Sequence, residues 1–144
     1  MSCRSVREDH REDLRRQSPG PRVEELAVLA EELGYHRFWL YDSPAIYEDV
    51  WIALGRLAGV TERIGLGTAV LVPYSRHPMV TASAIATMER LAPGRCAYAF
   101  GTGASARWCF GQPALTWRYM QTYLEQLRRC SPETWWRSTG SRAR

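Results

Sequence analysis

Lysine is absent from this 144-residue chain, so all of its positive side-chain charge comes from 19 arginines, set against 15 acidic residues. We attribute the use of arginine to the base composition of the coding sequence. The net charge of +4 arises at the two ends: residues 1–22 hold six Arg and four acids, and residues 130–144 hold three Arg and one acid. Residues 23–129 hold ten of each and cancel. A nucleic-acid partner requires a basic stripe on the folded part, so nucleic-acid binding is disfavoured.

Long apolar runs and clustered cysteines are also missing. No run approaches the roughly 20 residues of a membrane-spanning helix, and the first 17 residues lack the apolar segment of a signal peptide. We therefore expect a cytoplasmic protein without a membrane partner. No metal site is expected, because the four cysteines form no Cys-x-x-Cys pair and have no histidine at ligand spacing; they are Cys3, Cys96, Cys109 and Cys130. Cys96 falls in an apolar strand pattern, which predicts a buried thiol.

Helical and strand patterns alternate through the middle of the chain. The patterns predict helices at 21–33, 48–59, 78–94 and 113–129, and strands at 37–41, 63–72 and 95–100. Such alternation implies crossover connections and an α/β fold with a parallel sheet covered by helices. Residues 1–20 are predicted to be a charged, disordered arm, and residues 130–144 an irregular tail.

Two of these elements carry specific expectations about burial. The strand at 37–41, which reads RFWLY, is short and apolar, and we expect it to be buried on both faces. The first helix is expected to bury one face, formed by Val23, Leu26, Ala27, Ala30 and Leu33.

The loops that follow the strands are the longest connections. They span residues 42–49, 68–78 and 101–113 and hold most of the Gly, Pro and unusual aromatic residues. Ligands of parallel α/β proteins bind beyond the carboxyl ends of the strands, where these loops meet. The sequence therefore predicts a single functional face.

Two short motifs lie at the ends of strands. GTGASA, at residues 101–106, fits Gly-x-Gly-x-x-Ala and allows a nicotinamide-dinucleotide site of the Rossmann type. Against that interpretation, two strands precede the motif, and Glu125, at the distance of the expected acidic partner, falls in a helical pattern. The alternative interpretation is that the glycines serve only a tight turn. In the second motif, Gly67-Thr68 interrupts a strand, which suggests a β-bulge where the backbone approaches a neighbour closely.

Three segments carry a family resemblance in their order along the chain. LAEELGYHRFWLYDSPAIYEDVWIAL, RIGLGTAVLVPYSRHPMVTASAIATMERLAPGR and AFGTG resemble the luciferase-like flavin-dependent oxidoreductases, and within them the deazaflavin branch that includes methylenetetrahydromethanopterin reductase. The resemblance covers residues 21–129. It implies a partial TIM (β/α)8 barrel of about three to four βα units. It also implies coenzyme F420, a deazaflavin, in preference to FMN, and hydride transfer or monooxygenation of a small organic substrate.

The resemblance also implies positions for the site. A bulged strand with a cis peptide bond at Ala69–Val70 would back the cofactor ring. The cofactor-binding residues would be Asp42, Ser43, Thr68, Ala69, Val70, Thr102 and Gly103. On the substrate side the candidates are Tyr47, Arg76 and Trp108, each of which could instead be rim packing. Asp42 could merely close a turn, and His77 is interpreted as a helix-entry residue.

The resemblance assigns no catalytic acid or base. Ser43 and Ala104 stand where sugar-phosphate dehydrogenases of the family have His and Glu, which argues against that substrate class. The family barrel has eight strands in about 250 residues, whereas three are found here. We therefore expect a fragment, with a frameshift or truncation near residue 130 and little or no cofactor binding. The non-enzyme alternative is an assembly module whose open sheet a second chain completes, and a homo-oligomer would form through the open sheet edges.

Overall fold

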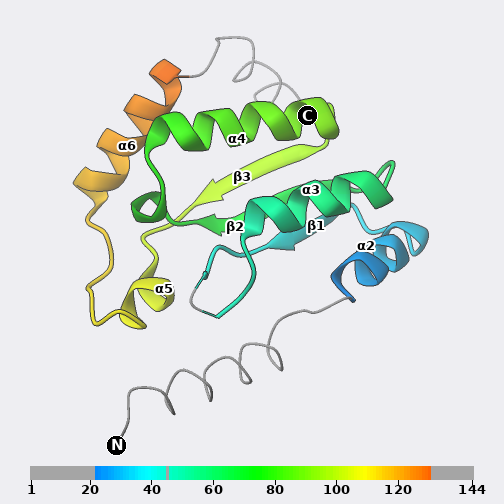
Figure 1. Cartoon of the computed structure of the whole chain (residues 1–144), viewed down its shortest axis with the longest axis horizontal. Coiled ribbons are helices and arrows are strands. Elements are labelled where there is room, and N and C mark those ends of the chain that lie inside the picture. Colours follow the sequence, from blue (N-terminus) through cyan, green and yellow to red (C-terminus); the bar gives the residue numbers. More distant parts are fainter. Residues whose placement is uncertain (1–21, 45, 131–144) are drawn as a thin grey trace, which may run out of the picture.

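The computed structural model describes residues 22–44 and 46–130, in which helices and strands alternate as predicted (Figure 1). The helices are α2 (Val23–Glu32), α3 (Val50–Val60), α4 (Pro78–Leu91), α5 (Ala104–Trp108) and α6 (Trp117–Cys130), with a 3-10 helix, η1, at Pro73–Ser75. The strands are β1 (Arg37–Leu40), β2 (Gly65–Leu71) and β3 (Cys96–Phe100). The arm predicted at 1–20 and the tail after Cys130 lie outside the described residues.

The three strands form one parallel sheet in the order β1-β2-β3. α3 and α4 lie side by side over the same face of that sheet (Figure 1). Sequential strand order with helices on one face is the arrangement of a barrel arc, because a doubly wound sheet places helices on both faces. The predicted α/β fold with parallel strands is confirmed.

The core lies between the sheet and the helices. Leu54 and Leu57 of α3 are 1% and 0% exposed and pack with Leu66 of β2, which is 1% exposed. Cys96 is 8% exposed in the same cluster, so the predicted buried thiol is confirmed. A second cluster joins α4 to α6, where the buried hydroxyls of Thr81 and Tyr123 share a hydrogen bond of 2.6 Å.

Two predicted burial patterns are wrong. α2 buries Val23 and Ala27, but Leu26 and Leu33 are 51% and 66% exposed. The reason is that α2 packs laterally against α3 and has no described neighbour on its other side. β1 is not buried on both faces, because Trp39 is 47% exposed. This strand is the edge of the sheet, and its alternation turns Trp39 away from the face that packs on the helices.

The interruption at Gly67 has a packing cause. Gly67 lies opposite Trp39 in the sheet register, and a Cβ at Gly67 would stand 2.5 Å from Cζ3 of the Trp39 ring. Glycine therefore lets the indole lie across β2. The register between β2 and β3 then shifts between Thr68 and Leu71, which confirms the predicted bulge. The peptide bond between Ala69 and Val70 is cis, as the resemblance implied.

Side-chain caps fix the beginnings of three helices. Asp49 accepts hydrogen bonds from the backbone N–H of Trp51 and Ile52 at the start of α3. His77 accepts one from Met79 N–H at the start of α4, which confirms its interpretation as a helix-entry residue. α6 begins at Trp117 and not at residue 113, because Thr116 provides the cap by accepting from Tyr119 N–H at 3.3 Å. Within the described ranges, every helix is too short or too polar to cross a membrane.

Candidate functional site

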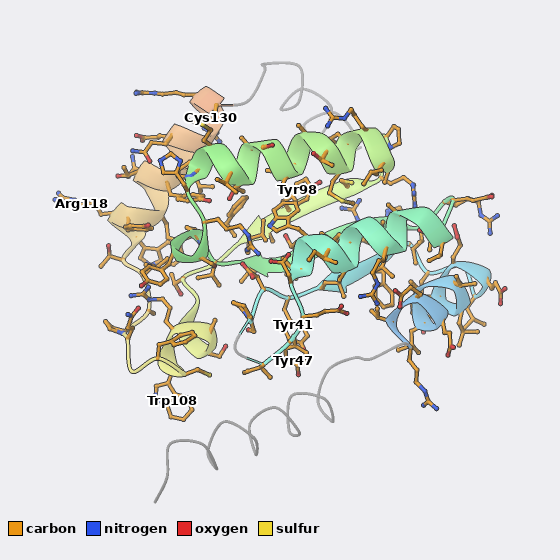
Figure 2. The ribbon with its side chains drawn as sticks, viewed as in Figure 1. Tyr41, Tyr47, Tyr98, Trp108, Arg118 and Cys130 are labelled. Carbon is orange, nitrogen blue, oxygen red and sulfur yellow. The ribbon has the colours of Figure 1, made fainter. Side chains whose placement is uncertain are left out.

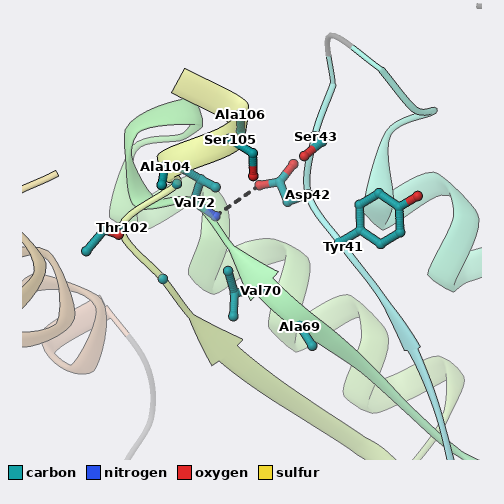
Figure 3. Close-up of a pocket in the computed structure, with 12 residues that line it drawn as sticks. Tyr41, Asp42, Ser43, Ala69, Val70, Val72, Thr102, Ala104, Ser105 and Ala106 are labelled. Carbon is teal, nitrogen blue, oxygen red and sulfur yellow. Dashed lines mark hydrogen bonds between the residues drawn. The ribbon is translucent and has the colours of Figure 1, made fainter. Parts of the chain in front are cut away.

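A pocket of about 350 Å3 opens where the three strands end (Figure 3). Its walls come from the segment after β1, the end of β2, the segment after β3 and the first turn of α5. The lining residues are Tyr41, Asp42, Ser43, Ala69, Val70, Val72, Gly101, Thr102, Gly103, Ala104, Ser105 and Ala106. The predicted functional face at the carboxyl ends of the strands therefore coincides with a real concavity.

The structure brings most of the predicted cofactor-binding residues together at this pocket. The ones that line it are Asp42, Ser43, Ala69, Val70, Thr102 and Gly103. Thr68 does not line it. Its side chain is 0% exposed in the interior, and its Oγ1 donates to the carbonyl of Ala99 at 3.5 Å. Thr68 therefore fixes β2 against β3 from behind the pocket.

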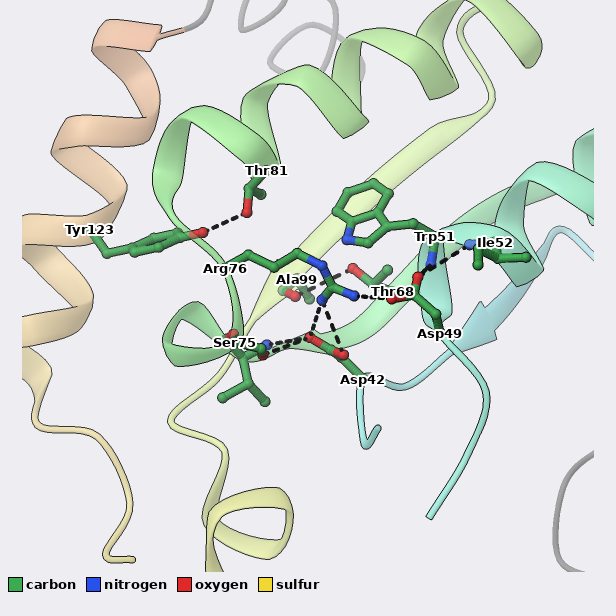
Figure 4. Close-up of polar contacts among 11 residues, drawn as sticks. Asp42, Asp49, Trp51, Ile52, Thr68, Ser75, Arg76, Thr81, Ala99 and Tyr123 are labelled. Carbon is green, nitrogen blue, oxygen red and sulfur yellow. Dashed lines mark hydrogen bonds and ion pairs between the residues drawn. The ribbon is translucent and has the colours of Figure 1, made fainter. Parts of the chain in front are cut away.

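The three substrate-side candidates do not line this pocket. The Tyr47 ring stands edge-on to Tyr41, with ring centroids 4.2 Å apart. Trp108 is 80% exposed on α5 and lies at the periphery of the molecule (Figure 2). Arg76 is largely buried behind the pocket, where it faces Asp42 (Figure 4). Their assignment to the substrate side stays a prediction, and for Arg76 the contacts favour another role.

Among the described residues, Asp42 is the only acidic one that lines the pocket, and it is almost completely buried, at 3% exposure. Its Oδ2 accepts hydrogen bonds from Val72 N–H at 3.2 Å and from Ser75 Oγ at 3.4 Å. The guanidinium of Arg76 contacts both carboxylate oxygens, at 3.4 and 3.3 Å. The negative charge of the pocket wall is therefore paired from behind with Arg76, which also pairs with Asp49.

The glycines of GTGASA are explained by close packing against the end of β2. A Cβ at Gly101 would lie 2.5 Å from Cγ2 of Val70, and one at Gly103 would lie 2.4 Å from Cγ1 of Val72. Gly103 also has a φ of +69°, in the left-handed region. The motif leads into the five-residue helix α5. These contacts favour the turn interpretation of the motif over a dinucleotide site.

Sequence reasoning missed six lining residues, which are Tyr41, Val72, Gly101, Ala104, Ser105 and Ala106. Tyr41, Gly101 and Ala104 adjoin predicted residues, and extending each predicted segment by one or two positions finds all of the six except Ala106. The helix α5 itself had no such signal, because residues 101–113 were predicted as a loop. Partial burial, followed by the interaction with Tyr47, raises the pKa of the Tyr41 phenol above its ordinary value of 10.0. Tyr41 therefore presents a neutral hydroxyl near pH 7.

Apart from Asp42, the described residues of this lining are uncharged. They include no arginine, lysine or histidine, and the wall is built from small apolar residues with hydroxyls at Ser43, Thr102 and Ser105. A serine nucleophile would need an adjacent base, and no described histidine lines the pocket. Among the described residues, no group of three or more His, Cys, Asp or Glu could hold a metal ion. The pocket is suited to a flat, uncharged ring.

Comparison with known proteins gives a consistent result. The family described as luciferase-like monooxygenase matches this chain over residues 5–139. The 5,10-methylenetetrahydromethanopterin reductase of Methanopyrus kandleri is 34% identical over 85 residues, which cover 59% of this chain and 24% of the reductase. The F420-dependent glucose-6-phosphate dehydrogenase of Kineococcus radiotolerans is 40% identical over 96 residues, which cover 60% of this chain and 28% of the dehydrogenase.

The fold comparison agrees. The solved structure of the coenzyme F420 dependent tetrahydromethanopterin reductase from Methanopyrus kandleri superposes with a TM-score of 0.59 and 31% identity. The matched region covers 67% of this chain and 28% of that structure. The described residues thus form a partial TIM barrel, and the chain spans about a quarter of the length of these relatives.

Proposed function

This chain belongs to the luciferase-like monooxygenase family, and we propose that it is an oxidoreductase whose pocket binds the ring of coenzyme F420. The reaction would be hydride transfer between the deazaflavin and a small organic substrate. The observation that carries the proposal is the pocket at the ends of β1, β2 and β3, which gathers Asp42, Ser43, Ala69, Val70, Thr102 and Gly103. The relatives described above, whose names include F420-dependent enzymes, support the choice of cofactor.

The residues present fit the ring of a deazaflavin. Ala69 and Val70 provide an apolar part of the pocket wall. Gly101 and Gly103 lack a Cβ, which lets the segment after β3 lie close against the end of β2. The hydroxyls of Ser43, Thr102 and Ser105 are available to the polar edge of a ring. The deazaflavin, when bound, supplies the hydride.

The chain's own contribution would be positioning and exclusion of water. The buried carboxylate of Asp42 is held by backbone and side-chain donors, so this part of the wall is preorganised before a ligand arrives. Because no acid–base pair lines the pocket, we assign no proton transfer to any residue. Ser43 and Ala104, where the resemblance implied His and Glu in sugar-phosphate dehydrogenases, argue against a sugar phosphate as the substrate.

FMN and monooxygenation are the second candidate, which the description of the matching family favours. We further propose that the isolated chain binds its cofactor weakly, because none of the described residues that line the pocket is cationic and could hold a phosphate-bearing tail. Association of two copies through the edge of the sheet is also proposed. The cytoplasmic location expected from the sequence stays a prediction.

A titration followed by NMR tests the proposal, since it detects weak binding. Coenzyme F420 added to the labelled full-length chain should shift the backbone amide signals of Asp42, Ser43, Thr102 and Gly103 in a saturable way. Ala104→Phe places a ring in the pocket and should weaken binding at least about tenfold, or about 1.4 kcal/mol. Ala114→Phe is the control, because Ala114 is exposed and does not line the pocket.

The comparison ligands are FMN and a nicotinamide dinucleotide at the same concentrations. Preference for FMN would move the assignment to the second candidate. Saturable binding of the nicotinamide dinucleotide alone would revive the interpretation of GTGASA as a phosphate loop. The proposal is wrong if none of the three ligands shifts the pocket signals.

A further inference from the structure

Arg76 lies between η1 and α4, and its side chain is only 17% exposed. One guanidinium nitrogen, Nη1, contacts both carboxylate oxygens of Asp42, and the other, Nη2, donates to Oδ2 of Asp49 (Figure 4). These two acids lie at opposite ends of the loop that joins β1 to α3. One arginine therefore connects both ends of that loop to the segment after β2.

The N-terminal cap of α3 sets the orientation of the Arg76 guanidinium. Asp49 Oδ1 accepts from the N–H groups of Trp51 at 2.9 Å and Ile52 at 3.3 Å, so the carboxylate is fixed as the cap of α3. Its other oxygen then holds Arg76. A planar guanidinium that is fixed at one end presents its remaining donors in one direction, and in this structure that direction is Asp42.

Asp42 needs this partner because it is buried. Its side chain is 2% exposed, and among the described residues Arg76 is the one donor to its Oδ1. A buried carboxylate without a counter-charge is strongly destabilised. Without Arg76, the side chain would turn towards solvent, which reaches it through the pocket that it lines.

We infer that Arg76 is a positioning residue that holds the Asp42 carboxylate back in the pocket wall and does not face the substrate. The inference rests on the proposed function for its effect on ligand binding. The positioning of Asp42 by Arg76 involves only residues of this chain and does not depend on the identity of the ligand. This role replaces the expectation that Arg76 lies on the substrate side. It also explains why Asp42, Arg76 and Asp49 form one polar network.

The chain offers a matched control in Arg56. Arg56 also bridges two acids, Glu24 and Glu48, but its side chain is 39% exposed on the outside of the helices, and it does not line the pocket. Arg76→Met should weaken F420 binding in the NMR titration at least about tenfold. Arg56→Met, which removes the same number of ion pairs, should leave the affinity within about twofold.

A double-mutant cycle separates positioning from general damage. If Arg76 acts through Asp42, adding Arg76→Met to Asp42→Asn should change the affinity by less than about twofold, because the charge to be held is already gone. The same cycle with Arg56→Met should be additive. Where Arg76→Met alone fails to fold, the double variant, in which a neutral amide replaces the buried carboxylate at residue 42, is compared with Asp42→Asn.

Amide hydrogen exchange gives a readout that needs no cofactor. Val72 N–H donates to Asp42 Oδ2, so its exchange should accelerate at least about tenfold in Arg76→Met and stay unchanged in Arg56→Met. If the folded wild-type chain binds no F420, the proposed function is wrong. The exchange rate of Val72 N–H then still tests whether Arg76 positions Asp42. The inference is wrong if the exchange rate of Val72 N–H is unchanged in Arg76→Met. It is also wrong if Arg76→Met leaves the F420 affinity unchanged and its effect simply adds to that of Asp42→Asn.

Discussion

Gly94 and Gly103 adopt the same left-handed conformation, each with a φ of +69°, but in different surroundings. A Cβ at Gly94 would meet nothing within 4 Å, whereas one at Gly103 would stand 2.4 Å from Cγ1 of Val72. Comparing the two positions separates two reasons why glycine is needed, a left-handed backbone conformation and the close approach of a neighbouring side chain. At Gly103 both apply, and the second concerns the shape of the pocket.

This comparison gives a prediction for single alanine substitutions. Gly94→Ala should cost about 1 kcal/mol of unfolding free energy through the left-handed conformation alone. Gly103→Ala should cost about 1 to 3 kcal/mol more, because its methyl group must displace Val72. Urea unfolding of both variants measures the difference. Adding Val72→Ala should make the Gly103→Ala substitution less costly. Equal costs at the two glycines would contradict the packing argument.

At the scale of secondary-structure elements, Glu31 ties the end of α2 to the segment that enters β2. Its carboxylate accepts hydrogen bonds from the backbone N–H groups of Glu62, Arg63 and Ile64. These bonds, led by that from Glu62, lower the pKa of Glu31 below its ordinary value of 4.5. A lowered folded-state pKa stabilises the fold above the unfolded pKa, and that contribution is lost as the pH falls through the folded pKa.

Glu31→Gln should therefore make the free energy of unfolding less dependent on pH in the acidic range. Above pH 5 the wild type should be the more stable protein, and the difference should shrink as the pH falls below about 4.5. Urea unfolding measured between pH 3 and 7 tests this. Glu32→Gln, at the exposed neighbouring position, is the control. A difference between wild type and Glu31→Gln that does not change with pH would show that the three N–H bonds do not depend on the charge.

The elements were predictable where their causes are local. Periodicity and caps such as Asp49 depend on residues within a turn or two, and these helices were found within a few residues of their ends. The pocket followed from topology, since parallel strands gather their carboxyl ends at one edge. The exposure of Leu26 and Trp39 was not predictable, because it depends on which neighbours lie beyond α2 and β1. The partners of Arg76 were missed because they lie 34 and 27 residues away in the chain.

At the scale of the whole molecule, α2 and the edge strand β1 both expose large apolar side chains. Leu26, Leu29 and Leu33 follow one another at helical spacing along α2 and are 51%, 48% and 66% exposed. Trp39, in β1, is 47% exposed. Exposed apolar side chains and an unpaired strand edge both favour association. This is the physical basis for expecting contact between copies on the β1 side.

The full chain should therefore self-associate as its concentration rises. Leu33→Glu and Trp39→Glu each place a charge on this side and should weaken association at least about tenfold, since a buried unpaired carboxylate opposes the contact. Ile52→Glu is the matched control, because Ile52 is 64% exposed on α3 and belongs to neither α2 nor β1. Sedimentation velocity over a range of concentrations measures the effect. If Ile52→Glu disperses the protein equally well, association is non-specific. If the wild type stays monomeric at every concentration, the prediction is wrong, and the monomer keeps the apolar side chains of α2 and β1 exposed to solvent.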